Sequence, residues 1–142
     1  MMTAPSPAIA PISHIHSYHA HIYFNDSAER ERAAIVREQI AERFTVQLGR
    51  WRETPVGPHT LPMYQVAFDI ALFPSLLPWL MLNRQDLTIL VHPNTDNPRR
   101  DHATHALWFG QVLDLKTAML SESIADDPLE VVVPNTVPSV AA

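Results

Sequence analysis

Histidine is the residue type in this chain whose spacing could support chemistry. Four of the eight histidines lie within residues 14–21, in the stretch SHIHSYHAHIYF, and they form two His-x-His pairs. Imidazole changes its protonation near physiological pH and is the commonest side-chain ligand of metal ions. The stretch is therefore either a solvated tail or a surface that gathers imidazoles for metal binding or proton transfer.

The two pairs differ in their setting. Residues 17–24 alternate in polarity as a half-buried strand does, which predicts that His19 and His21 share the face opposite the core. Two histidines at i and i+2 present nitrogens toward a common point, as first-row metals require. His14 and His16 precede this strand beside a proline-rich tail, and a solvated segment explains them better.

A third imidazole belongs to residues 87–93, a β-branched run that ends at a proline. Leu87, Ile89 and Val91 form its natural core set, which places His92 on the same open face as the first strand's pair. If the two strands are antiparallel neighbours, His92 comes close to His19 or His21. Two interpretations stay open, a metal site and a group of surface or interface histidines.

The remaining elements support this placement. A helix is expected at residues 27–43 after an N-cap at Asn25 or Asp26, then strands at 44–51 and 63–70. These are followed by a buried helix that begins at Pro74 and by the strand at 87–93. The last expected elements are a possible strand within 101–110 and a helical segment at 111–120. The order β-α-β-β-α-β predicts an α+β fold of the split ferredoxin-like type, with the helices on one face.

Other candidate site residues lie in loops. His59 follows Gly57 and Pro58 in the connection before the third strand, and we expect it at the opposite end of the sheet from His92, so that a partner subunit would be needed to unite them. His102 and His105 share one side only if their segment is helical. Arg99 and Arg100 offer bidentate contacts to a carboxylate, or are simply an exposed pair.

Composition narrows the class of protein. The chain has 142 residues, no cysteine and a formal net charge of −5, which argues against disulfides, thiolate metal sites, and general nucleic-acid or anionic-membrane binding. The N-terminal residues lack the basic region of a signal peptide, and no apolar run is long enough for a membrane span. We expect a cytoplasmic protein with a flexible tail at residues 1–12, one domain at 13–125 and a second tail at 126–142.

Four motifs together resemble a known family. YHAHIYF, VGPHTLPMYQVAF, LPWLMLNRQDLTILVHPNT and DHATHALWFG are similar, in order and spacing, to the small DOPA 4,5-dioxygenases of bacteria and fungi. The resemblance covers about residues 14–120. It implies a ferredoxin-like subunit that forms a homodimer and opens a catechol ring with O2 on non-haem Fe(II), for which zinc or nickel could substitute in a purified sample.

The resemblance also bears on individual residues. The family's recurring histidines fall on positions that include His59, His102 and His105, which we take as catalytic candidates, whereas the face argument assigns the metal to His19, His21 and His92. Non-haem iron commonly has one carboxylate ligand, and Asp69 or Asp101 could supply it. The alternative function is a non-catalytic or differently acting ferredoxin-like dimer that binds a metal or a small acid. Candidates for substrate binding are Tyr23, Arg99 and Trp108.

Overall fold

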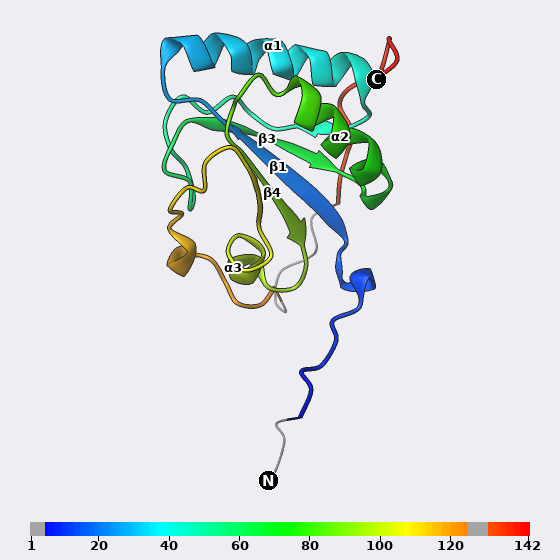
Figure 1. The fold of residues 1–142 in the computed structure, drawn as a ribbon, viewed down its shortest axis with the longest axis vertical. Coiled ribbons are helices and arrows are strands. Elements are labelled where there is room, and N and C mark those ends of the chain that lie inside the picture. The colour runs from blue at the N-terminus through cyan, green and yellow to red at the C-terminus, as the bar shows by residue number, and fades with distance from the viewer. Residues whose placement is uncertain (1–4, 125–130) are drawn as a thin grey trace.

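A five-stranded antiparallel sheet organises the protein. A computed structural model describes residues 5–124 and 131–142, and the strand order is β2-β3-β1-β4-β5. Figure 1 labels the three central strands, β3, β1 and β4. The strands are β1 (Ser17–Tyr23), β2 (Gln47–Leu48), β3 (Met63–Phe68), β4 (Ile89–Asn94) and β5 (Leu107–Phe109). The helices are α1 (Ser27–Arg43), α2 (Phe73–Asn83) and α3 (Pro98–Asp101), with 3-10 turns η1 (Ile12–His14), η2 (Ile70–Leu72) and η3 (Thr117–Met119).

The central strand β1 has antiparallel neighbours on both sides. β3 pairs with one edge of β1 and β4 with the other, and His19 lies directly opposite His92 in the β1–β4 register. The α+β class and the split order predicted from the sequence are confirmed. The predicted antiparallel contact between the first strand and the end of the fourth is confirmed as well.

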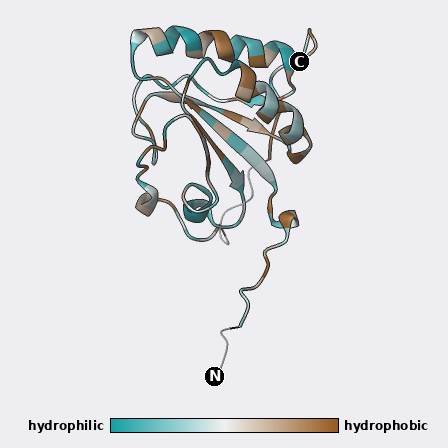
Figure 2. Cartoon of the chain, in the orientation of Figure 1, coloured by the Kyte–Doolittle hydropathy of each residue, from teal (hydrophilic) through white to brown (hydrophobic). Residues whose placement is uncertain are grey.

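The two long helices cover one face of this sheet. α1 begins after Asp26, whose side chain accepts a hydrogen bond from the backbone N–H of Glu29 at 2.8 Å, as an N-cap should. Figure 2 shows α1 as mostly hydrophilic with intermittent hydrophobic residues, so only a narrow stripe can face the sheet. That stripe consists of Ala33, Val36 and Ile40, and α2 adds Leu76, Leu77 and Leu80 to the same core.

The strands contribute alternate residues to this core. Ala20 and Ile22 of β1 and Ile89 and Val91 of β4 are almost fully buried under the helices, as the alternation predicted. Burial of the isoleucine and valine side chains stabilises the fold by about 1.5–3 kcal/mol each. The alternation therefore also fixes which residues must face the other side of the sheet.

That other side is not the open surface that we expected from the sequence. A second apolar cluster covers it, built around Tyr23, Met63 and Leu90. Side chains from two loops, including Leu61 and Leu113, pack on these residues together with Trp108 of β5. The two loops meet where the backbone N–H of Lys116 donates to the carbonyl of Pro58 at 2.9 Å. The face was predicted to be open because these loops carry few periodic apolar residues.

Two predicted elements are shorter than expected. The second strand is reduced to Gln47–Leu48, because its pairing with β3 becomes irregular at Gly49. The helical segment expected at residues 111–120 contains only the single turn η3. The possible strand within 101–110 is present as β5.

The C-terminal residues lie along β2. The side chain of Asn135 accepts a hydrogen bond from the N–H of Leu48 at 2.8 Å and donates to its carbonyl at 2.9 Å. The expected boundary at residues 125 and 126 lies outside the described residues, as do residues 1–4. None of the helices in the described ranges combines the length and apolarity that crossing a bilayer requires.

Candidate metal centre

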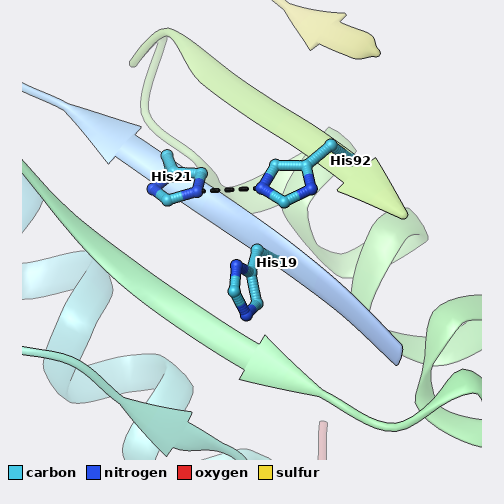
Figure 3. A group of neighbouring side chains, drawn as sticks. All are labelled: His19, His21 and His92. Carbon is cyan, nitrogen blue, oxygen red and sulfur yellow. Dashed lines mark hydrogen bonds between the residues drawn. The ribbon is translucent and has the colours of Figure 1, made fainter. Parts of the chain in front are cut away.

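Three histidines from the two adjacent strands converge beneath the loops. The Nε2 atoms of His21 and His92 are joined by a hydrogen bond of 3.1 Å, and the ring of His19 lies 5.0 Å from that of His92 between centroids (Figure 3). One ligand atom from each of the three residues lies within 4.8 Å of the others, and all three side chains are buried. The convergence predicted from strand alternation is confirmed.

A second group forms around the same His21. Its ring centroid is 4.2 Å from that of His59, and the ring of His102 lies 3.9 Å from that of His92. Ligand atoms of His21, His59 and His102 also lie within 4.8 Å of one another. Five imidazoles from four segments of one chain therefore share one site.

The position of His59 corrects our prediction that it lies at the far end of the sheet. The connection after β2 folds back over the sheet and turns sharply where the N–H of His59 donates to the carbonyl of Val56 at 3.1 Å. Gly57 in this turn has φ +57°, a conformation that favours glycine. The hairpin therefore delivers His59 to His21 within one subunit, without a partner chain.

Backbone carbonyls fix which ring nitrogens carry protons. The Nδ1 atoms of His92 and His102 lie 2.8 Å from the carbonyl oxygens of Pro93 and Pro98 respectively. A carbonyl only accepts, so each Nδ1 carries a proton, and the Nε2 of the neutral ring keeps its lone pair. Both rings are thus in the tautomer that can bind a metal through Nε2.

The surroundings favour the neutral form of His21, His59, His92 and His102. Burial lowers the pKa of His21 and of His92 well below the ordinary value, and neighbouring imidazoles lower both further. Burial, followed by nearby His102 and His19, lowers the pKa of His59 to about 4. Burial also lowers the pKa of His102, although its hydrogen bond to Pro98 opposes this change. Neutral imidazole is the form that metals bind.

Tyr23 and Trp108 lie at the edge of the cluster. The hydroxyl of Tyr23 is 2.7 Å from Nδ1 of His59, and burial raises the pKa of this tyrosine. The indole of Trp108 stacks on the Tyr23 ring with centroids 6.1 Å apart. These two predicted substrate-binding residues are therefore brought to the site by β1 and β5.

His105 and Arg99 are not brought to the cluster. Nδ1 of His105 donates to the carboxylate of Asp101 at 3.0 Å, and the ring lines a separate pocket of about 420 Å³ beside the N-terminal residues. The guanidinium of Arg99 donates to the carbonyls of Leu120 and Ala118 and to Glu122, which ties α3 to η3. In the structure both residues support the loop that carries His102.

Neither candidate carboxylate joins the imidazoles. Asp69 is exposed at the start of η2. Asp101 is buried, but its oxygens accept hydrogen bonds from the N–H and hydroxyl of Thr95, both at 2.7 Å. Within the described ranges, the two converging groups of candidate ligands at this site therefore consist of imidazoles alone, with no carboxylate.

The imidazole nitrogens suit a first-row transition metal. Two nitrogens at right angles on such an ion, each about 2.1 Å from it, lie about 3.0 Å apart, and the His21–His92 separation is 3.1 Å. Nδ1 of His21 is buried and has no hydrogen-bond partner within the described ranges. A buried polar atom without a partner is costly and often marks a site where a ligand binds. An imidazole donor set binds iron, zinc, copper and nickel.

A pocket of about 270 Å³ opens beside the cluster. His21, His59 and Gln65 line it, together with two arginines that our sequence reasoning did not select, Arg50 and Arg52. The signal was present in the sequence as an Arg-Trp-Arg alternation directly after β2. It was overlooked because a regular continuation of the strand would place both arginines on the helix-covered face.

Comparison with known proteins now decides the family. The profile of the Dopa 4,5-dioxygenase family matches residues 18–119, which include all five clustered histidines. The chain belongs to this family. A DOPA 4,5-dioxygenase of Amanita muscaria is 32% identical over 140 residues, and an uncharacterised 21.2 kDa protein of Botryotinia fuckeliana is 34% identical over 116 residues.

A solved structure agrees with the fold. The crystal structure of a proposed dioxygenase from Nostoc punctiforme is 49% identical and superposes with a TM-score of 0.76, covering 78% of this chain and 96% of that one. The matches to the two fungal relatives cover 92% and 73% of this chain but only 61% and 63% of the relatives' own lengths.

Proposed function

We propose that the protein is an extradiol dioxygenase that opens the ring of a catechol such as DOPA, using O2 and a histidine-bound Fe(II). The observation that carries the proposal is the facing pair His21 and His92, with 3.1 Å between Nε2 atoms, inside a buried imidazole cluster of a family member. The Amanita muscaria relative is named as a DOPA 4,5-dioxygenase, which supports the substrate class.

The proposed ligands of the iron are His19, His21 and His92. They come from paired strands, which hold side chains more rigidly than loops do. The hydrogen bond from His92 Nδ1 to Pro93 orients that ring and directs its Nε2 lone pair toward His21. Bound Fe(II) would supply adjacent positions for the two catechol oxygens and for O2.

The loop histidines are proposed to move protons. Ring opening needs a base for a catechol hydroxyl and later an acid. With a pKa of about 4, His59 is neutral at pH 7. If its Nδ1–H donates to the Tyr23 oxygen at 2.7 Å, its Nε2 is free to accept a proton from the substrate. His102, also neutral, is the second candidate for proton transfer.

The apolar surroundings of the site would exclude bulk water. Trp108 stacks on Tyr23 beside the histidines and offers an aromatic wall for a ring-shaped substrate. The contact between Lys116 and Pro58 joins the two covering loops above the sheet. The homodimer and the cytoplasmic location stay predictions from the sequence.

Anaerobic loading with Fe(II) tests the proposal directly. The loaded protein is mixed with DOPA and then with air, while an oxygen electrode and visible absorbance are recorded. We expect consumption of O2, a yellow ring-opened semialdehyde, and incorporation of both atoms of each O2 molecule into product, detected with labelled oxygen by mass spectrometry. Metal content is measured separately by atomic emission.

The outcomes separate the competing functions. Stoichiometric iron without oxygen uptake on any catechol would overturn the dioxygenase proposal and favour a metal-binding protein of another activity. The variants also test which histidines are the ligands. If variants of His59 and His102 lose the metal while variants of His19 and His92 retain it, the ligands are the second group, around His21. In both groups the ligand atoms lie within 4.8 Å of one another, so this experiment decides between them.

A further inference from the structure

The pairing between β2 and β3 contains a one-residue bulge. Leu48 lies opposite Val66, and Arg52 lies opposite Met63, so the β2 side has one residue more than the β3 side between these two pairs. The N–H of Gly49 donates to the carbonyl of Gln65 at 2.8 Å at this point. Bulges of this kind redirect side chains and are common beside active sites.

The bulge reverses the face on which the following residues lie. Val46 and Leu48 pack in the core under the helices, and regular alternation would place Arg50 and Arg52 there as well. Instead Trp51 enters that core, where its ring stacks on Phe24 at 4.2 Å.

The two arginines consequently line the pocket beside His21 and His59. They are two residues apart on an extended segment, so their side chains leave the backbone on the same side. The core packing of the tryptophan between them holds that segment in place.

Within the described ranges, no carboxylate neutralises the guanidinium groups of this pair. The nearest carboxylate in the sequence, Glu53, is held by Arg30 and accepts a hydrogen bond from Trp51 Nε1 at 2.8 Å. No acidic residue lines this pocket within the described ranges, and no ion pair of Arg50 or Arg52 is found there. In a chain with a net charge of −5, this is a local concentration of positive charge.

We propose that Arg50 and Arg52 bind the side-chain carboxylate of the substrate and make the enzyme selective for anionic catechols that lack an ammonium group. This proposal rests on the proposed function and refines its substrate class. A guanidinium forms bidentate, charge-assisted hydrogen bonds to a carboxylate. An amino acid such as DOPA also carries an ammonium, which the two arginines repel and which no acidic residue among the described residues of this pocket compensates.

Three catechols that share one ring and differ in side-chain charge test the selectivity. They are 3,4-dihydroxyphenylacetate (anionic), DOPA (zwitterionic) and dopamine (cationic). We expect kcat/KM and anaerobic affinity by calorimetry to fall in that order, with about tenfold or more between the first and the last. In the double variant Arg50→Gln/Arg52→Gln the three affinities should converge to within about twofold, chiefly through KM.

A charge-matched control removes two arginines from the other layer. The double variant Arg32→Gln/Arg43→Gln alters two residues of α1 whose side chains contact Gln85 and Glu42. It should keep the ligand order, and both double variants should bind iron as the parent protein does. Added salt should reduce the preference in the parent protein and in this control, but have little effect on the Arg50→Gln/Arg52→Gln variant.

Anaerobic affinity separates failure of this inference from failure of the proposed function. Equal affinities of the parent protein for the three catechols would overturn the inference, as would an unchanged order in the Arg50→Gln/Arg52→Gln variant. If the order appears in binding but no catechol consumes O2, the dioxygenase proposal fails and the anion site stands.

Discussion

At the scale of single residues, His21 is the side chain on which the site depends most. It belongs to both groups of converging imidazoles, its Nε2 faces His92, and its Nδ1 is buried without a partner within the described ranges. Replacement of His21 therefore removes a ligand from either possible metal site. His105, which is bonded to Asp101 outside the cluster, is the natural control.

We expect His21→Ala to lose bound iron almost completely and His105→Ala to retain it. Loss of one of three ligands usually costs several orders of magnitude in metal affinity, because the remaining two bind weakly. Metal stoichiometry after Fe(II) loading and gel filtration measures the result, and circular dichroism checks the fold. Full iron occupancy in His21→Ala would exclude this residue as a ligand.

Tyr23 permits a second prediction, because Tyr64 offers a matched control. Tyr23→Phe removes the hydroxyl that contacts His59, whereas Tyr64→Phe removes one that donates to the carbonyl of Ala33 on the helix side. Both changes should lower the free energy of unfolding by about 1 kcal/mol. Only Tyr23→Phe should lower kcat, roughly tenfold, with KM and iron content little changed, because His59 loses its orientation.

Comparison of the two variants separates an effect on catalysis from an effect on stability. Steady-state oxygen uptake and urea denaturation are measured on the same preparations of each. If kcat falls equally in both variants, the effect comes from stability, and Tyr23 has no role in orienting His59.

The position of a single side chain could be predicted from the sequence where strand alternation determined which face of the sheet it lies on. Alternation in two strands was enough to bring His19, His21 and His92 together. Nothing in periodicity could place His59 or His102, since a loop's path depends on turns and packing rather than on a repeat. The tautomers of His92 and His102 were also inaccessible, because they depend on carbonyls at particular positions.

At the scale of elements, the two long helices α1 and α2 and the central strands followed from local rules, and the bulge did not. The Asp26 cap and the apolar stripe of α1 predicted that helix to its ends. A bulge, by contrast, is a property of two strands in register, and only Gly49 hinted at it from one sequence. The missed bulge explains why Arg50 and Arg52 were absent from our candidate list.

Gly49 tests the bulge itself. A Cβ at this position would lie 3.3 Å from Cβ of Gln65, on a strand that cannot move freely. We expect Gly49→Ala to lower the free energy of unfolding by about 1 kcal/mol and to reduce discrimination between anionic and cationic catechols. Urea denaturation and the three-ligand calorimetry measure the two effects.

Gly57→Ala serves as the comparison, because a Cβ there meets nothing within 4 Å although φ is +57°. This substitution should cost backbone strain of about 1 kcal/mol without changing the ligand order. A Gly49→Ala variant with the ligand preference of the parent would show that the bulge does not need glycine to direct the arginines.

At the scale of the whole molecule, the buried imidazoles couple stability to pH. Burial lowers the pKa of His59 from 6.5 to about 4, and the pKa values of His21, His92 and His102 are lowered too. In the unfolded chain these groups take up protons below about pH 6.5, whereas in the folded chain they do not. The unfolded state therefore binds more protons in this range, and folding stability falls as the pH falls.

We expect the metal-free protein to lose stability steadily from about pH 6.5 down to about pH 4, below which the contribution of His59 is constant. Each histidine of this kind adds up to about 1.4 kcal/mol per pH unit. Urea denaturation at several pH values measures the slope, and His59→Gln should make it shallower. A stability that does not change between pH 7.5 and pH 5 would contradict the depressed pKa values.

The overall architecture was the most predictable level, since the order of elements and the core faces led to the correct sheet. The coverage of the second face was not, because Leu61 and Leu113 reach it from irregular loops. This coverage turns a surface patch of imidazoles into a buried centre.

The position of Trp108 has a practical consequence. Its indole stacks on Tyr23 and lines a pocket with His102, whereas Trp51 and Trp79 pack into the core on the helix side. Emission from Trp108 should therefore respond to quenching by an ion or a ring at the histidines, while the other two indoles provide a constant background. The fluorescence of Trp108 should therefore allow titrations with a metal ion or a catechol to be followed without any added dye.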